Sequence, residues 1–371
     1  MSKGIYIGVS GKARKVKKMY IGVGGKARKV KKAYIGVGGK ARQFWSGGEL
    51  AYYGKAANLS NGRLNLAATA VGSYALFSGG RVSGDDTHSK IVDAYNKSLT
   101  RSTPTELSYG RQLHAAAAVG NYALFAGGSG SSNLSSVEAY DASLTRTTIS
   151  NLNVSAYNIG AAEVGNYALF AGGAGSSFRA NVNAYDTSLT RTNPTSLSRA
   201  RGKPAGAKVG NYAIFGGGET SSYTNATDAY NSSLTQSTPA ALSESKYDLA
   251  AATAGNYALF AGGYGKDRLS SADAYNASLT KTAASNLSIA RRYLAATAIG
   301  GYALFGGGNA ANAAYSSVVD SYDASLVRKT ETPLSTARSS LAAAAIGDYA
   351  LFGGGVDERV YSSMIVDAYT A

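Results

Sequence analysis

Residues 114–128 read HAAAAVGNYALFAGG, and variants of this stretch recur throughout the chain of 371 residues. The segment YALF, once YAIF, is followed closely each time by a glycine pair or triplet, and it begins at Tyr74, Tyr122, Tyr167, Tyr212, Tyr257, Tyr302 and Tyr349. Successive copies begin 45 to 48 residues apart. Short β-prone runs separated by glycine turns at this period indicate repeated small β-sheets and not a helical solenoid.

The unit around this stretch, residues 111–155, divides into four strands. Gly120-Asn121 separates two apolar runs and predicts a tight hairpin turn, and the segments SVEAYD and TRTTISNL supply two further strands. The first strand is poor in bulky side chains in every copy, as expected where seven strands converge on a crowded axis. Seven such units predict a seven-bladed β-propeller.

Two further markers recur seven times and locate the closure of the ring. A pair that is usually Ala-Tyr ends at Tyr95, Tyr140, Tyr185, Tyr230, Tyr275, Tyr322 and Tyr369, and a leucine recurs at Leu59, Leu107, Leu152, Leu197, Leu242, Leu287 and Leu334. The last unit stops three strands in, at IVDAYTA. We therefore expect residues 50–59 to pair beside residues 364–371 and to supply the missing outer strand.

The order of these motifs resembles the kelch repeat over residues 50–371: a hydrophobic residue before Gly-Gly, a variable loop, VEAYD, then a Leu and an Arg. Kelch repeats usually carry a Trp seven positions after the Tyr, a place that here holds Thr147, Thr192, Ser237 and Thr282. We therefore expect Tyr and Phe to form the packing between blades. The predicted fold is all-β, a kelch-like propeller over residues 47–371 closed by an N-terminal strand and preceded by a small antiparallel β-repeat leader.

That leader, residues 1–46, holds nearly all of the net charge of +15. It contains 13 of the 37 lysines and arginines and none of the 22 acidic residues, so 24 basic residues remain for the propeller against 22 acidic ones. Such an asymmetry marks a domain boundary and assigns affinity for an anionic partner to the leader. The basic side chains expected to mediate attachment are Lys12, Arg14, Lys15, Lys17, Lys18, Lys26, Arg28, Lys29, Lys31 and Lys32.

The leader repeats with a period of 14, starting with YIGV at Tyr6, Tyr20 and Tyr34. The pairs Ser10-Gly11, Gly24-Gly25 and Gly38-Gly39 predict two-residue hairpin turns, and hence a meander of about four strands. Lys18 would then lie opposite Lys31, and Lys17 opposite Lys32. Like charges in such pairs repel, so we expect an acidic neighbouring subunit, a bound polyanion, or a bend at these lysines.

Residues 4–45 also resemble an N-terminal repeat, GKARKVKK then GYIGV then GKARQFW, of tail-associated structural proteins from phages and prophages of Gram-positive bacteria. The resemblance implies a virion protein on the tail or capsid exterior, joined to other virion proteins through residues 1–46. The start of the chain lacks an apolar core for a signal peptide, and no stretch is long and apolar enough for a membrane span. We expect synthesis in the bacterial host cytoplasm, and leave a homo-oligomer such as a trimer open.

The composition argues against several enzyme classes. The chain has no Cys and only two histidines, His88 and His114, which excludes thiolate metal sites and a kelch-type copper oxidase. The glycine pairs precede a loop and a strand, without the helix N-terminus of a phosphate site. We therefore expect no metal, no cofactor and no enzymatic activity. A glycan-processing enzyme stays an alternative, because a carboxylate pair need not be adjacent in sequence.

Two sets of charged residues in the propeller have competing interpretations. Glu163 and Lys208 occupy the same inner-strand position in adjacent units, either as residues lining the channel or, as we prefer, as an ion pair. Four residues past each leucine marker stand Arg63, Arg111, Ala156, Arg201, Lys246, Arg291 and Arg338. These basic residues suggest either a cationic collar for an anionic glycan or, as we prefer, hydrogen bonding to loop carbonyls.

The loops after the glycine pairs differ most between units, and together with the segments after each leucine marker they should emerge on one face. The predicted binding residues on that face are Tyr157, Phe178, Arg179, Tyr223, Tyr264, Arg268, Arg292, Tyr293 and Tyr315. Exposed aromatic residues among polar loops suit a host-surface glycan or protein, although scattered tyrosines also occur without function. The sequence thus favours a receptor-binding virion protein, with a leader that binds nucleic acid or another polyanion as a further alternative.

Overall fold

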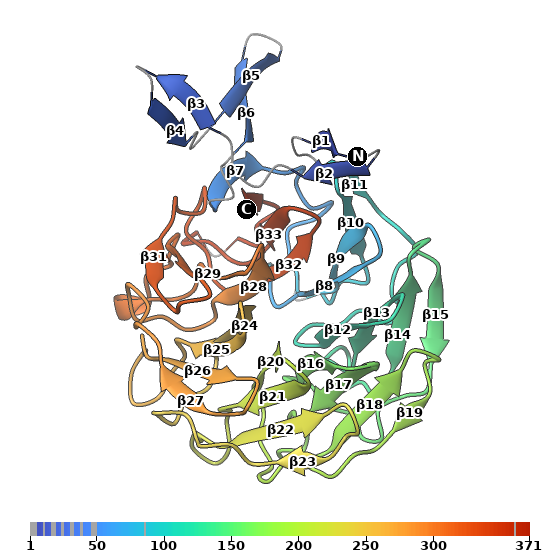
Figure 1. The fold of residues 1–371 in the computed structure, drawn as a ribbon. Coiled ribbons are helices and arrows are strands. Elements are labelled where there is room, and N and C mark those ends of the chain that lie inside the picture. Colours follow the sequence, from blue (N-terminus) through green and yellow to red (C-terminus); the bar gives the residue numbers. More distant parts are fainter. Residues whose placement is uncertain are drawn as a thin grey trace.

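The computed structural model describes strands within residues 6–45, and residues 50–371 apart from positions 85, 86 and 360. Among the described residues the regular structure is β-strand, with one 3-10 turn, η1 (Ala311–Ala313). Seven four-stranded antiparallel sheets surround a common axis (Figure 1). The predicted seven-bladed β-propeller is confirmed.

Each blade is numbered by its order along the chain, and its strands are given from the axis outward. Blade 1 consists of β8 (Ala67–Val71), β9 (Tyr74–Ser78), β10 (Val92–Asn96) and β11 (Arg101–Ser102). Blade 2 consists of β12 (Ala115–Val119), β13 (Tyr122–Ala126), β14 (Val137–Asp141) and β15 (Arg146–Ile149). Blade 3 consists of β16 (Gly160–Val164), β17 (Tyr167–Ala171), β18 (Val182–Asp186) and β19 (Arg191–Thr192). Blade 4 consists of β20 (Ala205–Val209), β21 (Tyr212–Gly216), β22 (Thr227–Asn231) and β23 (Gln236–Ser237). Blade 5 consists of β24 (Ala250–Ala254), β25 (Tyr257–Ala261), β26 (Ala272–Asn276) and β27 (Lys281–Ala283). Blade 6 consists of β28 (Ala295–Ile299), β29 (Tyr302–Gly306), β30 (Val319–Tyr322) and β31 (Arg328–Thr330). Blade 7 is β32 (Ala342–Ile346), β33 (Tyr349–Gly353), β34 (Val366–Thr370) and the N-terminal β7 (Ala51–Lys55).

The turn between the two inner strands of a blade requires glycine. In blade 2, Val119 pairs with Tyr122, so Gly120 and Asn121 form the predicted two-residue hairpin loop. Gly120 has a φ of 54°, and a Cβ added there would lie 2.9 Å from Cγ2 of Thr187 in blade 3. Glycine therefore meets both the backbone conformation of the turn and the close approach of the next blade.

The inner strands explain why the first run of each unit is rich in alanine. A Cβ added to Gly206 in β20 would collide with the carbonyl oxygen of Ala161 in β16, the inner strand of the preceding blade. Neighbouring inner strands thus approach too closely for bulky side chains on this side. The expectation of small residues near the axis is confirmed.

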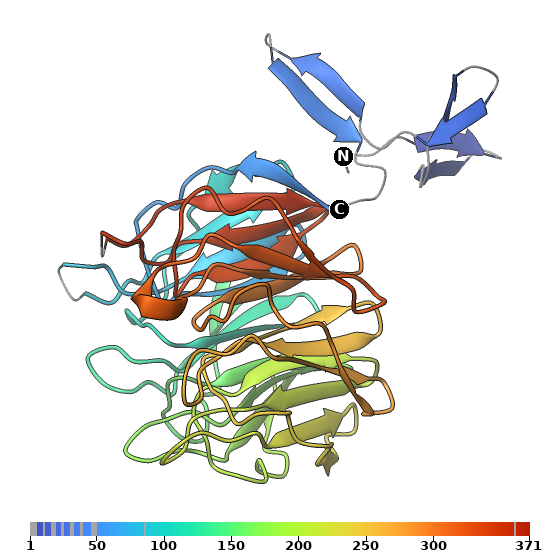
Figure 2. The same ribbon diagram turned by 90° about the vertical axis from the view of Figure 1, so that its left-hand side faces the viewer.

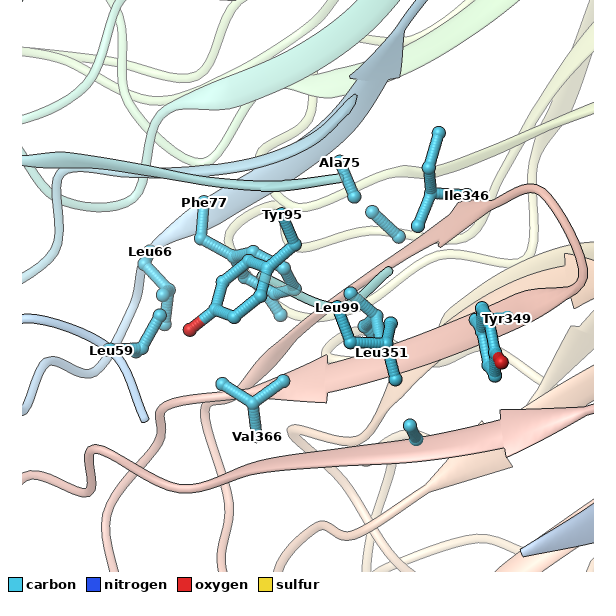
Figure 3. Close-up of a cluster of buried hydrophobic side chains, with 13 residues drawn as sticks. Leu59, Leu66, Ala75, Phe77, Tyr95, Leu99, Ile346, Tyr349, Leu351 and Val366 are labelled. Carbon is cyan, nitrogen blue, oxygen red and sulfur yellow. The ribbon is translucent and has the colours of Figure 1, made fainter. Parts of the chain in front are cut away.

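Between blades, a Phe and a Tyr take the place of the missing Trp. In every blade the Phe of the second strand meets the Tyr of the third edge to face, with ring centroids 5.7 to 6.1 Å apart. Each buried Tyr hydroxyl also donates to a loop carbonyl, as Tyr140 does to Thr105 at 2.7 Å. Figure 3 shows one such core, in which Phe77 and Tyr95 of blade 1 lie near Leu351 and Val366 of blade 7.

The ring closes as predicted, through a strand from the N-terminal side of the propeller. β7 pairs antiparallel with β34, with Ala51 opposite Thr370 and Lys55 opposite Asp367. The hydroxyl of Tyr52 donates to Oδ1 of Asp367 at 2.8 Å. Blade 7 therefore joins both ends of the propeller, and a single missing strand would leave its sheet edge unpaired.

The described strands of the leader form three separate hairpins, so the prediction of a meander of about four strands is wrong. The two-stranded sheets are β1 (Tyr6–Val9) with β2 (Lys12–Lys15), β3 (Tyr20–Val23) with β4 (Lys26–Lys29), and β5 (Ala33–Val37) with β6 (Lys40–Trp45). The registers pair Val9 with Lys12 and Val23 with Lys26, which confirms two-residue turn lengths.

The described strands β2 and β4 end at Lys15 and Lys29, before each Lys-Lys pair, so the expected pairings of these lysines fall outside the described residues. Of the predicted attachment residues, Lys12, Arg14, Lys15, Lys26, Arg28 and Lys29 belong to β2 and β4. Lys17, Lys18, Lys31 and Lys32 lie outside the described residues.

Candidate functional site

The variable loops and the segments after each leucine marker lie together on one face of the ring, which we call the loop face. Backbone bridges join the two kinds of segment in every blade, as Tyr157 to Ala174 and Ala174 to Phe178. Figure 2 shows the ring from the side, with η1 of one such loop drawn in orange at the left. The hairpin turns, such as Gly120-Asn121, lie at the opposite ends of the strands.

Most of the predicted binding residues lie in these bridged segments. Tyr157, Phe178, Tyr223, Tyr264, Arg268, Arg292 and Tyr315 each form a backbone bridge on blades 3 to 6. All seven are half-buried, so each presents part of its side chain to solvent. Arg179 lies beside them and donates to the hydroxyls of Ser176 and Ser177. Together these side chains form an arc on the loop face, the aromatic arc.

The arc does not converge on a single point. Arg268 donates to Oδ1 of Asn309, at 2.8 Å from its Nη2, and the guanidinium of Arg292 stacks on the rings of Tyr264 and Tyr293 at 4.6 and 4.7 Å. Only Tyr293 of the predicted set lines the central cavity described below. The predicted residues therefore make a broad surface, and a more enclosed site lies next to it.

Seven residues with a left-handed backbone encircle the axis at the loop face. One comes from each blade boundary, immediately before the inner strand segment, and their φ angles are 53 to 56°: Asn65, Leu113, Asn158, Lys203, Asp248, Tyr293 and Ser340. Backbone hydrogen bonds link six of the seven successive pairs of members, as from the N–H of Leu113 to the carbonyl of Asn65 at 3.0 Å. We call this circle the mouth ring. Positive φ is uncommon for Leu, Lys and Tyr, and such strain is concentrated at functional positions.

The mouth ring surrounds a cavity of about 540 Å³ at the loop-face end of the axis. Its floor comes from the residue after each ring member: Leu66, His114, Ile159, Pro204, Leu249, Leu294 and Leu341. Six of the seven mouth-ring side chains are polar, whereas six of the seven floor side chains are apolar. Cavities of this size and mixed lining are typical of small-molecule sites.

A charged cluster occupies one side of the mouth ring. Nζ of Lys203 lies 3.1 Å from Oδ1 of Asp248 and 3.4 Å from Oε2 of Glu219, and Nη1 of Arg292 lies 3.9 Å from Oδ2 of Asp248. The Lys203 ammonium also lies over the Tyr247 ring, 4.9 Å from its centroid. Two cations and two carboxylates therefore balance one another in this cluster.

Burial and neighbouring charges shift the pKa values of Asp248 and Lys203 in opposite directions. Burial raises the pKa of Asp248, and the positive charge of Lys203 opposes that rise. Burial lowers the pKa of Lys203, but the charges of Asp248, Tyr293 and Glu219 and the hydrogen bond to Asp248 together outweigh burial and hold the pKa above its usual value. Burial, followed by the charge of Asp248, raises the pKa of Tyr293. Perturbed groups of this kind in a cavity mark a candidate functional site.

His114 is the polar exception in the floor. Its Nε2 lies 2.8 Å from Oγ of Ser78, whereas its Nδ1 is buried without a hydrogen-bond partner. Burial, and then the charges of Arg111 and Arg63, lower the pKa of His114 well below the usual value, which keeps the ring neutral. Sequence reasoning did not nominate His114, Lys203 or Asp248 as binding residues.

The arginine column does not form a cationic collar. All six basic residues of the column, Arg63, Arg111, Arg201, Lys246, Arg291 and Arg338, are fully buried. Each pairs with a buried carboxylate of the third strand, as Arg111 with Glu138 at 2.6 Å and Arg291 with Asp320 at 2.9 Å. In blade 3, where Ala156 replaces the base, the neutral Asn183 replaces the acid. The structural interpretation is confirmed, and the collar for an anionic glycan is wrong.

The preferred ion pair between Glu163 and Lys208 is also wrong. The carboxylate of Glu163 accepts the backbone N–H of Ala118 in blade 2, at 3.1 Å, and not the ammonium of Lys208, which is exposed. Burial raises the pKa of Glu163, whereas the Ala118 hydrogen bond and the charge of Lys208 oppose the rise. The close spacing of inner strands lets a Glu side chain reach the backbone of the preceding blade.

The described part of the chain contains no cluster of three or more His, Asp or Glu side chains able to hold a metal ion. It also contains no helix long and apolar enough to cross a membrane.

Comparison with known proteins bears on the fold alone. No protein-family model and no curated protein matches the sequence. Among solved structures, one described as "Structure of YjhT" aligns with a TM-score of 0.59 and 12 % identity, covering 75 % of this chain and 99 % of that one. At such low identity the similarity extends to the architecture and not to a shared ligand or activity. On its own geometry and on this comparison, the chain is a seven-bladed β-propeller.

Proposed function

We propose that the protein is a non-enzymatic phage virion protein, attached to the tail or capsid through residues 1–46, whose propeller binds a glycan or protein on the host surface. The observation that carries this proposal is the direction in which the chain enters the propeller. Ala51 pairs with Thr370 at the hairpin end of blade 7, opposite the loop face. The segment leading from the leader therefore enters on the side away from the aromatic arc.

This arrangement suits a protein that is anchored on one side and binds on the other. The excess positive charge of residues 1–46 favours contact with acidic surfaces of neighbouring virion proteins. The aromatic arc and the variable loops lie on the far side, where exposed Tyr and Arg side chains are typical of binding surfaces. The finer assignment to kelch-type propellers rests on motif order and is part of the same proposal.

The test combines localisation with cell binding by the full-length protein. Antibody labelling should detect the protein on the outside of virions, and fluorescent protein should bind host cells. The triple variant Y157A/Y223A/Y315A should lose binding, whereas N121A, an exposed turn residue on the opposite face, should bind as the parent does. Absence from virions together with absence of cell binding would refute the proposal.

A glycan-processing enzyme is a second candidate, favoured by one observation. Asp248 is buried in the cavity wall beside Lys203 and Tyr293, and its raised pKa is the kind that general acids require. Release of reducing ends from host polysaccharide, abolished in D248N, would establish this function. Binding of the same polysaccharide without any product would support the non-enzymatic proposal.

A further inference from the structure

We infer that the mouth-ring cavity is a binding site for a short uncharged saccharide, one or two sugar residues long. The inference rests on the proposed function only in taking the loop face as the binding face. It assigns the ligand class to a part of that face which the aromatic arc does not include.

The first argument is the polarity of the cavity wall. Six consecutive mouth-ring residues are polar, from Asn158 around the ring to Ser340 and Asn65. Below them the floor is apolar except for His114. A ligand that fills this space needs polar groups along its edge and an apolar face, and a pyranose ring has both, in its hydroxyls and its C–H faces.

The second argument is the hydrogen-bonding capacity left open at the cavity. The side chains of Asn158 and Ser340 line the cavity and are half-buried, so both are open to a ligand. Oδ2 of Asp248 and Nδ1 of His114 are buried without a hydrogen-bond partner, and a buried unpaired polar atom is costly. The lining thus offers a carboxylate acceptor from Asp248, the amide of Asn158 and the hydroxyl of Ser340. A hydroxyl both donates and accepts, so it can serve all of these groups.

The third argument is charge. Lys203 already lies between Asp248 and Glu219, and Arg292 lies 3.9 Å from Asp248. A carboxylate or phosphate ligand would compete with Asp248 for both cations, whereas a cation would compete with Lys203 and Arg292. A neutral ligand leaves the pairs of Lys203 with Asp248 and Glu219 intact. Arg292 is a quarter exposed over Oδ2 of Asp248, so an outward shift of its side chain is what gives a ligand hydroxyl access to that oxygen.

The chain itself supplies matched variants for a test. Asn65 and Asn158 occupy the same ring position as Asp248 with the same backbone conformation, so D248N removes the carboxylate at a position that accepts Asn. Leu113 occupies it in blade 2, so N158L removes the amide in the same way. N121A on the opposite face is the control. Equal melting temperatures would show that the variants fold.

The experiment is calorimetric titration of the full-length protein with methyl glucoside, methyl galactoside, methyl mannoside and N-acetylglucosamine, with glucuronic acid as the charged counterpart of glucose. At least one neutral sugar should bind, more tightly than glucuronic acid. D248N should weaken the affinity for the neutral sugar at least about tenfold, as expected for a lost charged hydrogen bond. N158L should also weaken this affinity, and N121A should leave it unchanged. No binding of any neutral sugar, or tighter binding of glucuronic acid that D248N enhances, would overturn the inference.

The two proposals fail separately. If D248N abolishes sugar binding but antibody labelling finds no protein on virions and the protein does not bind cells, the saccharide site is supported and the virion function is refuted. If the protein binds host cells through the aromatic arc while no neutral sugar binds, the function stands and the saccharide site falls.

Discussion

Oγ of Ser78 in blade 1 lies 2.8 Å from Nε2 of His114 in the loop that enters blade 2, and both side chains are buried. Neither residue follows the pattern of the other blades. The positions equivalent to Ser78 hold only Ala or Gly, and those equivalent to His114 hold Leu, Ile or Pro. A polar pair has therefore replaced an apolar pair as a unit.

This relationship predicts strong coupling between the two positions. H114L should destabilise the fold by about 1–3 kcal/mol because it leaves the Ser78 hydroxyl buried and unpaired, and S78A should do the same to His114. The double variant S78A/H114L restores the pattern of the other blades and should be close to the parent in stability. Urea unfolding of all four proteins gives the coupling energy. Simple additivity of the two losses would contradict the pairing.

The same histidine predicts a pH dependence of stability. Its pKa in the folded protein is lowered below the usual 6.5 by burial and by Arg111 and Arg63, so the unfolded chain binds the proton more readily. His114 therefore contributes stability that is fully present above about pH 6.5 and declines as the pH falls below that value, by up to about 1.4 kcal/mol per pH unit. Unfolding free energies measured between about pH 7.5 and pH 5 should show this decline in the parent and a shallower one in S78A/H114L. Parallel pH profiles of the parent and S78A/H114L would show that His114 does not cause the decline in stability.

The buried arginine column yields a prediction with a natural control. R291A leaves Asp320 buried without its main partner and should destabilise the propeller by about 3–5 kcal/mol. R291A/D320N recreates the Ala156 and Asn183 combination of blade 3 and should recover a large part of that loss. R199A, at an exposed position, should change the unfolding free energy by less than about 0.5 kcal/mol. Equal losses of unfolding free energy in R291A and in R291A/D320N would show that an unpaired Asp320 carboxylate does not cause the destabilisation.

Ring closure predicts unequal effects of two N-terminal deletions. Removal of residues 50–58 takes away β7, its ladder with β34, and the Tyr52 hydrogen bond to Asp367, so the melting temperature should fall by about 10 °C. Removal of residues 1–46 should leave it nearly unchanged, because the described strands of the leader pair only with one another. Differential scanning calorimetry distinguishes the two. A stable protein without residues 50–58 would mean that β7 contributes little to closure.

Part of the site was readable from the sequence and part was missed. The loop face and the positions of Tyr157, Tyr223 and Tyr315 followed from variable loops at a fixed place in each unit. Lys203 and Asp248 belong to a column six residues after each leucine marker that reads Asn, Leu, Asn, Lys, Asp, Tyr and Ser. The available signal was a variable, mostly polar position directly before a mostly apolar one. The joint appearance of Ala156 and Asn183 likewise indicated the buried base-acid pairs.

The sequence by itself determined the seven blades, their hairpin turns, the Phe and Tyr packing and the strand that closes the ring. These features are local, because each unit of about 45 residues carries its own turns and strands, and closure needs only a count of strands. Tertiary structure alone decided which side chains meet: that Glu163 bonds to Ala118 and not to Lys208, that the arginine column is buried, and that one column forms a cavity. Such contacts depend on how closely neighbouring blades and loops pack around the ring, which the pattern of a single unit does not fix.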